Sequence, residues 1–352
     1  MSVYLNGSSR LQRGLFSDHI LQKRTACQLG QTVDLPYFNL FESPLLPLSE
    51  LYRLIDEQIE QALAQAGWAK LERSNIPIFL GSTGYVIADC EYRLQHNQPL
   101  PTEYSLAVIG DHLRQRYQTE VYSLATSCTS SAQGIHYAEQ MIRQGVCDKA
   151  LVIGFESFNR LTFEHFHAMN LLADRTPYLP LFEPNGIVLG EGLACVALSN
   201  QPHHAFTAEL LGFHSLTDNQ NLTNSDERQF HHLIEQILAK AGLRAEQIAG
   251  VKVHGVGGQS DEMECQLLAQ YFPQSRWIVA KAYLGHTLGA TGVVETAFLQ
   301  NCLWHGRLPS LQNLAVSHPL ATEQWLPNGY YLNYFLGFGG SHVGWVLRWE
   351  KA

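Results

Sequence analysis

The sequence predicts an α/β protein in which helices cover sheets. Segments typical of buried strands alternate along the chain with segments that carry apolar residues at helical spacing. Both halves repeat the order strand, polar turn, helix and strand, which indicates an internal duplication without evident sequence identity. The 352 residues are 45% hydrophobic and 16% charged, a composition that suits a well-filled globular core.

In the first half, short apolar runs predict strands and longer periodic runs predict helices. Strands are expected at residues 3–5, 76–80, 149–155 and 193–198, with another leading into Cys128. Helices are expected at about 51–67, at 103–118, and from Cys128 to a C-terminal stop at Gly145. The strand at 3–5 is expected at a sheet edge, and residues 8–46 and 157–186 lack a clear period and are expected to be mostly irregular.

The second half follows the same scheme. Strands are expected at 206–213, 248–253 and 277–280, and helices at 227–241, 260–271 and 288–304. Near the C-terminus, residues 330–335 and 343–347 flank a glycine-rich turn and predict a hairpin.

Cys128 lies where an expected strand gives way to a helix. The unpaired N–H groups and the positive end of the helix dipole at such a position favour a thiolate, which is the nucleophilic form of cysteine. Taken alone, however, a free cysteine is more often a buried structural residue. The interpretation of Cys128 therefore depends on residues far downstream.

Polar residues also stand at other expected strand ends, where functional groups of open α/β sheets collect. His254 follows one apolar run, and Lys281 follows another and precedes His286, with Glu295 in the next helix. With 16 histidines in the chain, any single one is more often structural than catalytic. The glycine-rich turns fit neither Gly-x-Gly-x-x-Gly nor Gly-x-x-x-x-Gly-Lys-Ser/Thr, so a nucleotide site is a weak interpretation.

Taken together, these motifs resemble the β-ketoacyl-acyl carrier protein synthases, the condensing enzymes of the thiolase superfamily. The order and approximate spacing of separated motifs agree with that family over residues 76–346. These motifs are Ser127-Cys128-Thr129-Ser130-Ser131-Ala132, Gly190-Glu191-Gly192, His254-Gly255, Lys281 with Gly285-His286-Thr287, and Gly337-Phe338-Gly339-Gly340. The resemblance implies a thiolase-like fold with two similar halves, residues 1–200 and 201–352, in a layered αβαβα arrangement.

The resemblance also implies a Cys-His-His site. Cys128 would hold an acyl group as a thioester, while His254 and His286 would hydrogen-bond the thioester carbonyl of a malonyl unit. The enolate formed as carbon dioxide leaves would be stabilised by these fixed donors and would attack the acyl-cysteine.

Other residues take supporting roles by the same resemblance. The backbone N–H groups of Cys128 and Phe338 would form an oxyanion hole, and Phe338 would be the gating aromatic residue. Lys281 would be buried near the second histidine and Glu295, and Gly337 and Gly339 would shape the turn at Phe338. The resemblance requires no metal or other cofactor.

Two departures from the family pattern leave alternatives open. Val256 and Gly258 stand where threonines usually contact the pantetheine arm, and residues 183–187 replace a longer stretch that carries an arginine. These changes fit a ketosynthase of a specialised polyketide or aryl polyene system, within the wider alternatives of fatty acid or polyketide biosynthesis. They also fit a weakly or non-catalytic partner resembling a chain-length factor, although most chain-length factors lack the active cysteine, and Cys128 argues against that interpretation.

Other members of the superfamily match less well. A thiolase would need a second catalytic cysteine near the C-terminus, and Cys302 falls in an expected helix. A ketoacyl synthase of type III has asparagine at the position of His286.

Composition limits the partners and the compartment. The net charge of −9 argues against nucleic-acid binding, and no apolar run is long enough to span a bilayer. Seven scattered cysteines without Cys-x-x-Cys spacing argue against a metal site and for a reducing, cytoplasmic setting. The resemblance implies a homodimer, or a heterodimer with a paralogous ketosynthase, and acyl- and malonyl-loaded carrier proteins as partners. Because carrier proteins are acidic, basic residues are docking candidates, namely Arg10, Arg13, Lys23 and Arg24.

Overall fold

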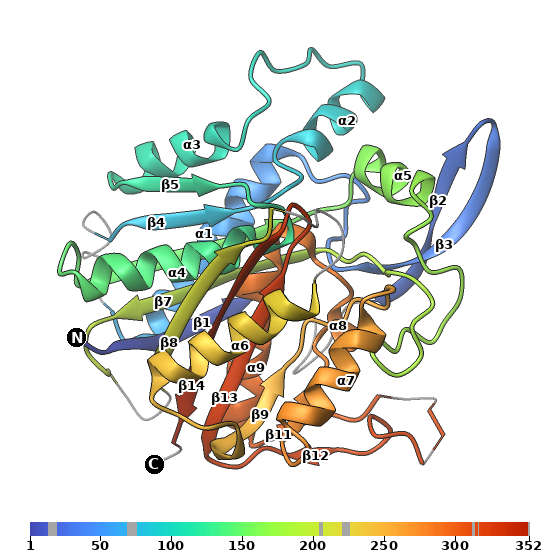
Figure 1. The fold of residues 1–352 in the computed structure, drawn as a ribbon. Coiled ribbons are helices and arrows are strands. Elements are labelled where there is room, and N and C mark those ends of the chain that lie inside the picture. The colour runs from blue at the N-terminus through green and yellow to red at the C-terminus, as the bar shows by residue number, and fades with distance from the viewer. Residues whose placement is uncertain are drawn as a thin grey trace.

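The computed structural model describes residues 1–12, 20–68, 76–203, 207–219, 226–311, 314–315 and 317–350, and it is a layered α/β structure (Figure 1). The elements of the first half are β1 (Val3–Arg10), β2 (Ile20–Gln28), β3 (Gln31–Asn39), α1 (Leu48–Gln65), β4 (Ile78–Gly81), α2 (Ile87–Gln95), α3 (Ala107–Tyr117), β5 (Val121–Leu124), α4 (Ser130–Arg143), β6 (Lys149–Glu156), α5 (Arg160–Ala168) and β7 (Gly192–Ser199). Those of the second half are β8 (Ala208–Thr217), α6 (Glu227–Ala241), β9 (Ile248–Lys252), α7 (Asp261–Tyr271), β10 (Arg276–Ile278), α8 (Lys281–Leu284), α9 (Thr291–His305), β11 (Arg307–Leu308), β12 (Gln324–Trp325), β13 (Gly329–Leu336) and β14 (Ser341–Trp349).

The main sheet is built from two five-stranded halves with the same topology. The first half has the order β1-β7-β6-β4-β5, and the second has the order β8-β14-β13-β9-β10. In each half the first two strand pairs are antiparallel and the last two are parallel. A short antiparallel pairing of β1 with β8 joins the halves. This shared order confirms the predicted similarity of the halves, and the division at residue 200, between β7 and β8, stays a prediction.

Helices cover both outer faces of the sheet and fill the space between its halves. Helix α1 packs on β1 and β7, and α6 packs on β8 and β14. Between the halves, α4 contacts β4 and β6 on one side and β8 and β14 on the other, with α9 packed beside it. Nearly all of α9 is buried, as expected for an apolar helix in a central layer. The arrangement confirms the predicted αβαβα layers.

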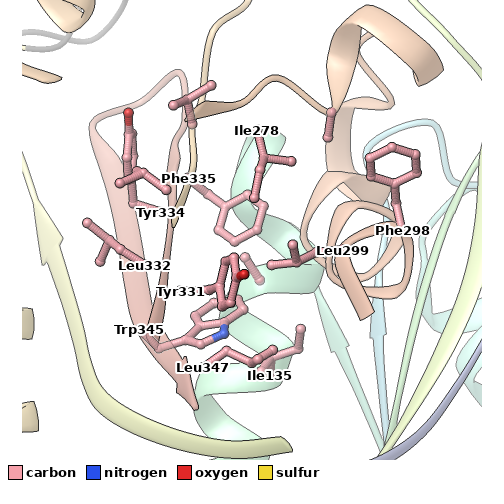
Figure 2. Packing of buried hydrophobic residues seen from close by; sticks show 14 of the residues in the cluster. Ile135, Ile278, Phe298, Leu299, Tyr331, Leu332, Tyr334, Phe335, Trp345 and Leu347 are labelled. Atoms are coloured by element: carbon pink, nitrogen blue, oxygen red, sulfur yellow. The ribbon is translucent and has the colours of Figure 1, made fainter. Parts of the chain in front are cut away.

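The central layer is held by large side chains of the β13–β14 hairpin. Tyr331, Phe335 and Trp345 are each fully buried. Figure 2 shows them with Ile135 of α4 and Leu299 of α9. Full burial of a large apolar side chain contributes roughly 1.5–3 kcal/mol, so this cluster anchors the helices that carry the site residues.

Glycine lets the two central helices approach closely. A Cβ atom on Gly292, at the start of α9, would lie 2.1 Å from the backbone nitrogen of Ala132 in α4. Backbone atoms cannot move aside as a flexible side chain can, so only glycine fits without separating the helices.

Replacing Gly292 with alanine should therefore lower the free energy of unfolding by at least about 3 kcal/mol. Gly145, which follows α4, is a matched control because a Cβ atom there would meet nothing within 4 Å. Its positive φ of 73° is then the main source of strain in Gly145→Ala, so the free energy of unfolding should fall by only about 1 kcal/mol. Urea denaturation measures both losses, and equal values would contradict a tight α4–α9 contact.

Some expectations about the elements were wrong. The strand expected at an edge is β1, which extends to Arg10 and lies in the middle of the sheet. The structure describes most of residues 8–46 as regular, because β2 and β3 form a hairpin. The prediction failed because the exposed outer part of this hairpin carries no alternating apolar pattern. Helix α5 interrupts the segment 157–186, and α2 was not anticipated. Lys281 begins the short helix α8 and does not end a strand.

Candidate active site

Cys128 sits on a tight turn that the chain fixes through its own hydroxyl groups. After β5, residues Ser127–Thr129 form a single 3₁₀ turn that leads directly into α4. Ser127 has a positive φ of 54°, which is unusual for a residue other than glycine. The Ser130 hydroxyl donates to the Ser127 carbonyl at 2.6 Å and accepts from the Thr126 N–H at 2.9 Å. This turn confirms the predicted strand-to-helix position of Cys128.

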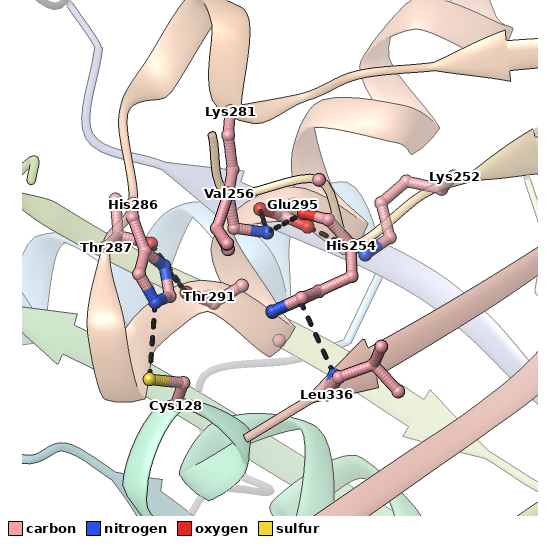
Figure 3. A network of polar contacts seen from close by, with 12 residues as sticks. Cys128, Lys252, His254, Val256, Lys281, His286, Thr287, Thr291, Glu295 and Leu336 are labelled. Atoms are coloured by element: carbon pink, nitrogen blue, oxygen red, sulfur yellow. Dashed lines mark hydrogen bonds and ion pairs between the residues drawn. The ribbon is translucent and has the colours of Figure 1, made fainter. Parts of the chain in front are cut away.

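The structure brings Cys128 and both predicted histidines together (Figure 3). The Cys128 Sγ lies 3.2 Å from His286 Nε2. On its other side, His286 Nδ1 lies 3.3 Å from the Thr291 hydroxyl, which can donate or accept. The ring centroids of His254 and His286 are 6.1 Å apart and the rings are nearly perpendicular, at 86°. Three chemically active side chains, from three distant parts of the sequence, therefore border one space.

Burial determines the charge state of these groups. It raises the pKa of the Cys128 thiol to about 11, although the Phe338 N–H and Lys281 act in the opposite direction. The expectation that the helix terminus alone would favour a thiolate was therefore wrong in direction, because loss of solvation has the larger effect. The thiol needs a base to remove its proton, and His286 Nε2 is in contact with it.

Both imidazoles are held neutral. Burial, and next the positive charge of Lys281, keep the pKa of His254 and of His286 well below the usual range. The Leu336 N–H points at His254 Nδ1 from 3.4 Å, so Nδ1 is an acceptor and Nε2 carries the hydrogen. A neutral ring with a hydrogen on Nε2 can donate a hydrogen bond into the site.

Lys281 and Glu295 are fully buried behind the histidines. The Lys281 ammonium donates to the His254 backbone carbonyl at 2.7 Å and lies 2.7 Å from Glu295 Oε1. The lysine is thus hydrogen-bonded to the backbone of the first histidine, and its charge also acts on His286. A second lysine, Lys252, lies 2.7 Å from the other oxygen of Glu295.

Buried carboxylates hold the loops that carry the histidines. Glu264 accepts hydrogen bonds from the N–H groups of His254 and Gly255 at 2.8 and 2.9 Å. Glu156 accepts from the N–H groups of Gly84 and Gly289 at 2.6 and 3.0 Å, which ties the loop after β4 to the loop after His286. Burial raises the pKa of both carboxyl groups to about 7.

The glycine-rich turn between β13 and β14 places Phe338 against the nucleophile. The backbone N–H groups of Phe338 and of Cys128 act as donors that lower the pKa of the Cys128 thiol, against the larger effect of burial. Gly339 and Gly340 have φ values of 84° and 74°. A Cβ atom on Gly340 would also meet the Asp218 carbonyl oxygen at 2.0 Å, so the turn requires glycine there.

A packed apolar cluster surrounds Cys128, and an open cavity lies beside this cluster. The buried cluster around it contains Tyr37 from the β2–β3 hairpin together with Phe158, Phe163 and Val256. Next to this cluster, a cavity of about 880 Å³ is lined by Val256, Phe338 and the loops around 170 and 185. The open cavity therefore leads from the surface to Val256 and Phe338, and the side chains packed around Cys128 are apolar.

The sequence reasoning missed several residues of this site. They are Tyr37, Glu156, Lys252, Asp261 and Glu264. One signal was available for Lys252, because a lone lysine in a buried strand is rare unless its charge is paired. No sequence signal pointed to Tyr37, because the segment around it lacks the clear period that predicts a strand or a helix.

Comparison with protein families agrees with this geometry. The description "Beta-ketoacyl synthase, N-terminal domain" matches residues 17–204, and "Beta-ketoacyl synthase, C-terminal domain" matches residues 207–315. The chain belongs to the β-ketoacyl synthase family. The matched N-terminal segment contains Cys128, and the C-terminal one contains His254 and His286, with Lys281 and Glu295.

Individual relatives are distant. The chain is 25% identical over 331 residues to 3-oxoacyl-[acyl-carrier-protein] synthase 2 of Rhizobium meliloti, which covers 82% of this chain and 78% of that protein. It is 26% identical over 358 residues to a lovastatin diketide synthase of Monascus pilosus, covering 91% of this chain but only 14% of that much longer protein. A solved ketosynthase in complex with its chain-length factor, from Xenorhabdus doucetiae, has the same fold, with a TM-score of 0.72, 20% identity and 99% and 98% coverage of the two chains.

The described part of the chain lacks two further features. It contains no helix long and apolar enough to cross a membrane. It also contains no group of three or more His, Cys, Asp or Glu side chains that could hold a metal ion.

Proposed function

We propose that this chain is a β-ketoacyl-acyl carrier protein synthase, which condenses a malonyl unit with an acyl group held on Cys128. The reaction lengthens the acyl chain by a two-carbon keto unit and releases carbon dioxide. The observation that carries the proposal is the contact between Cys128 Sγ and His286 Nε2 at 3.2 Å, with His254 beside it. The relative from Rhizobium meliloti, named as a 3-oxoacyl-[acyl-carrier-protein] synthase, supports the same reaction class.

Acyl transfer comes first. His286 Nε2 accepts the thiol proton as Sγ attacks the carbonyl carbon of an acyl thioester, and the proton passes to the departing carrier thiol. The N–H groups of Cys128 and Phe338, both of which lower the pKa of the Cys128 thiol, stabilise the negative charge that develops on the carbonyl oxygen. The Thr291 hydroxyl can donate to or accept from His286 Nδ1, so it fits both tautomers of the ring. His286 Nε2 can therefore accept a proton in this step and donate a hydrogen bond in the next.

Condensation follows in the same space. The malonyl thioester loses carbon dioxide, and the electron pair of the broken C–C bond moves onto the thioester oxygen, where His254 and His286 donate hydrogen bonds. The enolate carbon attacks the acyl-cysteine and forms the new C–C bond. Cys128 departs as a thiolate and takes up a proton, which restores the enzyme. Lys281 and Glu295 keep the His254 loop in place.

The proposed partners are acyl carrier proteins and a second ketosynthase-like subunit. The solved neighbour is a ketosynthase in complex with a chain-length factor, which supports the second partner. Two of the basic docking candidates are unsuitable. Arg10 is only 7% exposed, and Arg24 packs over the Phe158 ring at 4.4 Å and bonds Asn39. Lys23 is exposed and stays a candidate, while Arg13 lies outside the described residues.

A condensation assay tests the proposal. The purified chain is incubated with an acyl-loaded and a malonyl-loaded carrier protein, and the products are identified by mass. We expect a β-ketoacyl carrier protein and carbon dioxide. Absence of this product over a range of acyl lengths, both alone and with a paralogous ketosynthase, would refute the function.

A non-catalytic partner subunit is the second candidate. The observation that favours it is the aromatic filling beside Cys128, where Tyr37 packs edge-on against Phe158 and Phe163 at 5.2 and 5.7 Å. The absence of threonine at Val256 and Gly258 points the same way. In that case the chain would shape the product of an active ketosynthase, and only that ketosynthase would become acylated.

The aromatic side chains of α5 should set the accepted chain length. Phe163 is buried near Cys128, and Phe166 stacks on Phe338 with centroids 6.2 Å apart. We expect Phe163→Ala and Phe166→Ala to shift preference towards longer acyl groups by roughly tenfold or more, since each opens space in the apolar cluster beside Cys128. Competition between acyl carrier proteins of different lengths measures this. Leu161→Ala, an exposed change on the same helix, is the control, and an unchanged preference in both phenylalanine variants would contradict the assignment.

A further inference from the structure

Behind the two histidines, a buried glutamate is shared by two lysines. Lys252, the last residue of β9, lies 2.7 Å from Glu295 Oε2, and Lys281 lies 2.7 Å from Glu295 Oε1. All three side chains are at most 1% exposed (Figure 3). Because the Glu295 carboxylate contacts two ammonium groups, these three side chains together carry an excess positive charge when both lysines are protonated.

Structural support for His254 does not require this second lysine. Lys281 alone bonds the His254 carbonyl, and Glu264 holds the N–H groups of the same loop. Lys252 instead donates to the Tyr334 carbonyl at 2.9 Å and lies over the Phe335 ring, 3.5 Å from its centroid. Burying an unbalanced charge costs free energy, so a function that uses the charge explains its presence better than stability does.

We propose that Lys252 is a positioning residue whose buried charge, shared through Glu295, stabilises the enolate formed when the malonyl unit loses carbon dioxide. This inference rests on the proposed function. The Lys252 ammonium donates to Glu295 and to the Tyr334 carbonyl and not to the imidazole of His254 or His286. Its effect is electrostatic: negative charge appears on the thioester oxygen beside His254 and His286 during decarboxylation, and a fixed positive charge in a water-poor site lowers that barrier.

The same charge keeps the histidines neutral. Lys252 and Lys281 both lower the pKa of His254 and of His286, after the larger effect of burial. Neutral rings act as donors without becoming acids that would protonate the enolate carbon. Acylation should depend less on Lys252, because among the lysines Lys281 is the one that acts on Cys128.

The charge of Lys252 should be lost in mildly alkaline solution. Burial lowers its pKa to about 8, opposed by Glu295 and Glu264 and reinforced by Lys281. The charged and titratable groups facing it are therefore Glu295 on α9, Lys281 on α8, Glu264 on α7 and His254 after β9. Since the protonated form is the active one, the enolate step should slow as pH rises through about 8.

The test measures decarboxylation separately from acyl transfer. In a Cys128→Ala background, malonyl-pantetheine is the single substrate and the release of carbon dioxide is measured. The pH is varied from about 6.5 to about 9.5, which brackets the Lys252 pKa of about 8. Adding Lys252→Met should slow the reaction about tenfold at pH 7 and remove the decline near pH 8. Lys149→Met, which removes another strand lysine packed over an aromatic ring, is the matched control and should change neither quantity.

The outcomes separate this inference from the function on which it rests. No decarboxylation in the Cys128→Ala parent would count against the proposed function itself. Decarboxylation at an unchanged rate in Lys252→Met, or with the same alkaline decline, would overturn the role of Lys252 alone. If Lys252→Met does not fold, the parent profile decides, because a rate that stays flat through pH 8 would overturn the inference and a decline there would support it.

Discussion

The Cys128→Ala variant should form no covalent acyl adduct, and its condensation rate should fall at least about 10⁴-fold. The change removes the only sulfur in contact with His286 Nε2 among the described residues. It leaves the hydroxyl hydrogen bonds of the turn intact, because Ser130 makes them. The variant should therefore fold normally, and its two histidines should still decarboxylate a malonyl thioester.

Intact mass and product analysis check this result. Cys147→Ala is the control, since Cys147 follows α4 at its far end and is only partly buried. An acyl adduct that persists in Cys128→Ala and disappears in another cysteine variant would place the nucleophile elsewhere.

The His254→Ala variant should show the opposite behaviour. Removing one fixed donor at the enolate oxygen should lower the condensation rate by at least about a hundredfold. Acylation of Cys128 should continue, because His286 is the ring in contact with the sulfur. The His254 loop should keep its place, since Glu264 and Lys281 bond its backbone and not its imidazole.

Separate assays of acyl adduct formation and of condensation check this second result. His96→Ala, at the exposed end of α2, is a matched control. Loss of both steps to the same degree in His254→Ala, with the fold intact by circular dichroism, would contradict the division of labour between the two histidines.

The fold was predictable wherever local pattern and tertiary burial agree. The strand before His254 and the helix after Cys128 bury apolar residues at their natural spacing, and both were found near the expected positions. The β2–β3 hairpin was missed because solvent surrounds much of it and its stability comes from strand pairing. The central position of β1 depends on pairing with β7 and β8, which no local pattern reveals.

The sequence predicted which residues the structure brings together at the candidate site, but not the residues that support them. Cys128, His254, Lys281 and His286 stand in motifs whose order is recognisable, and the structure brings them together. The charge state of Cys128 was not predictable, because it depends on how deeply the turn is buried. Lys252 and Glu264 act through contacts with distant segments, so only the folded chain shows what they do.

Intact-mass spectrometry of the purified chain tests the central claim most directly. The chain is incubated alone with carrier proteins that bear acyl groups of different lengths, beside the Cys128→Ala variant. We predict that the chain gains the mass of one acyl group and that the variant gains none. If the chain stays unmodified at every length while a co-purified ketosynthase becomes acylated, the claim of catalysis is contradicted and the chain is the partner subunit.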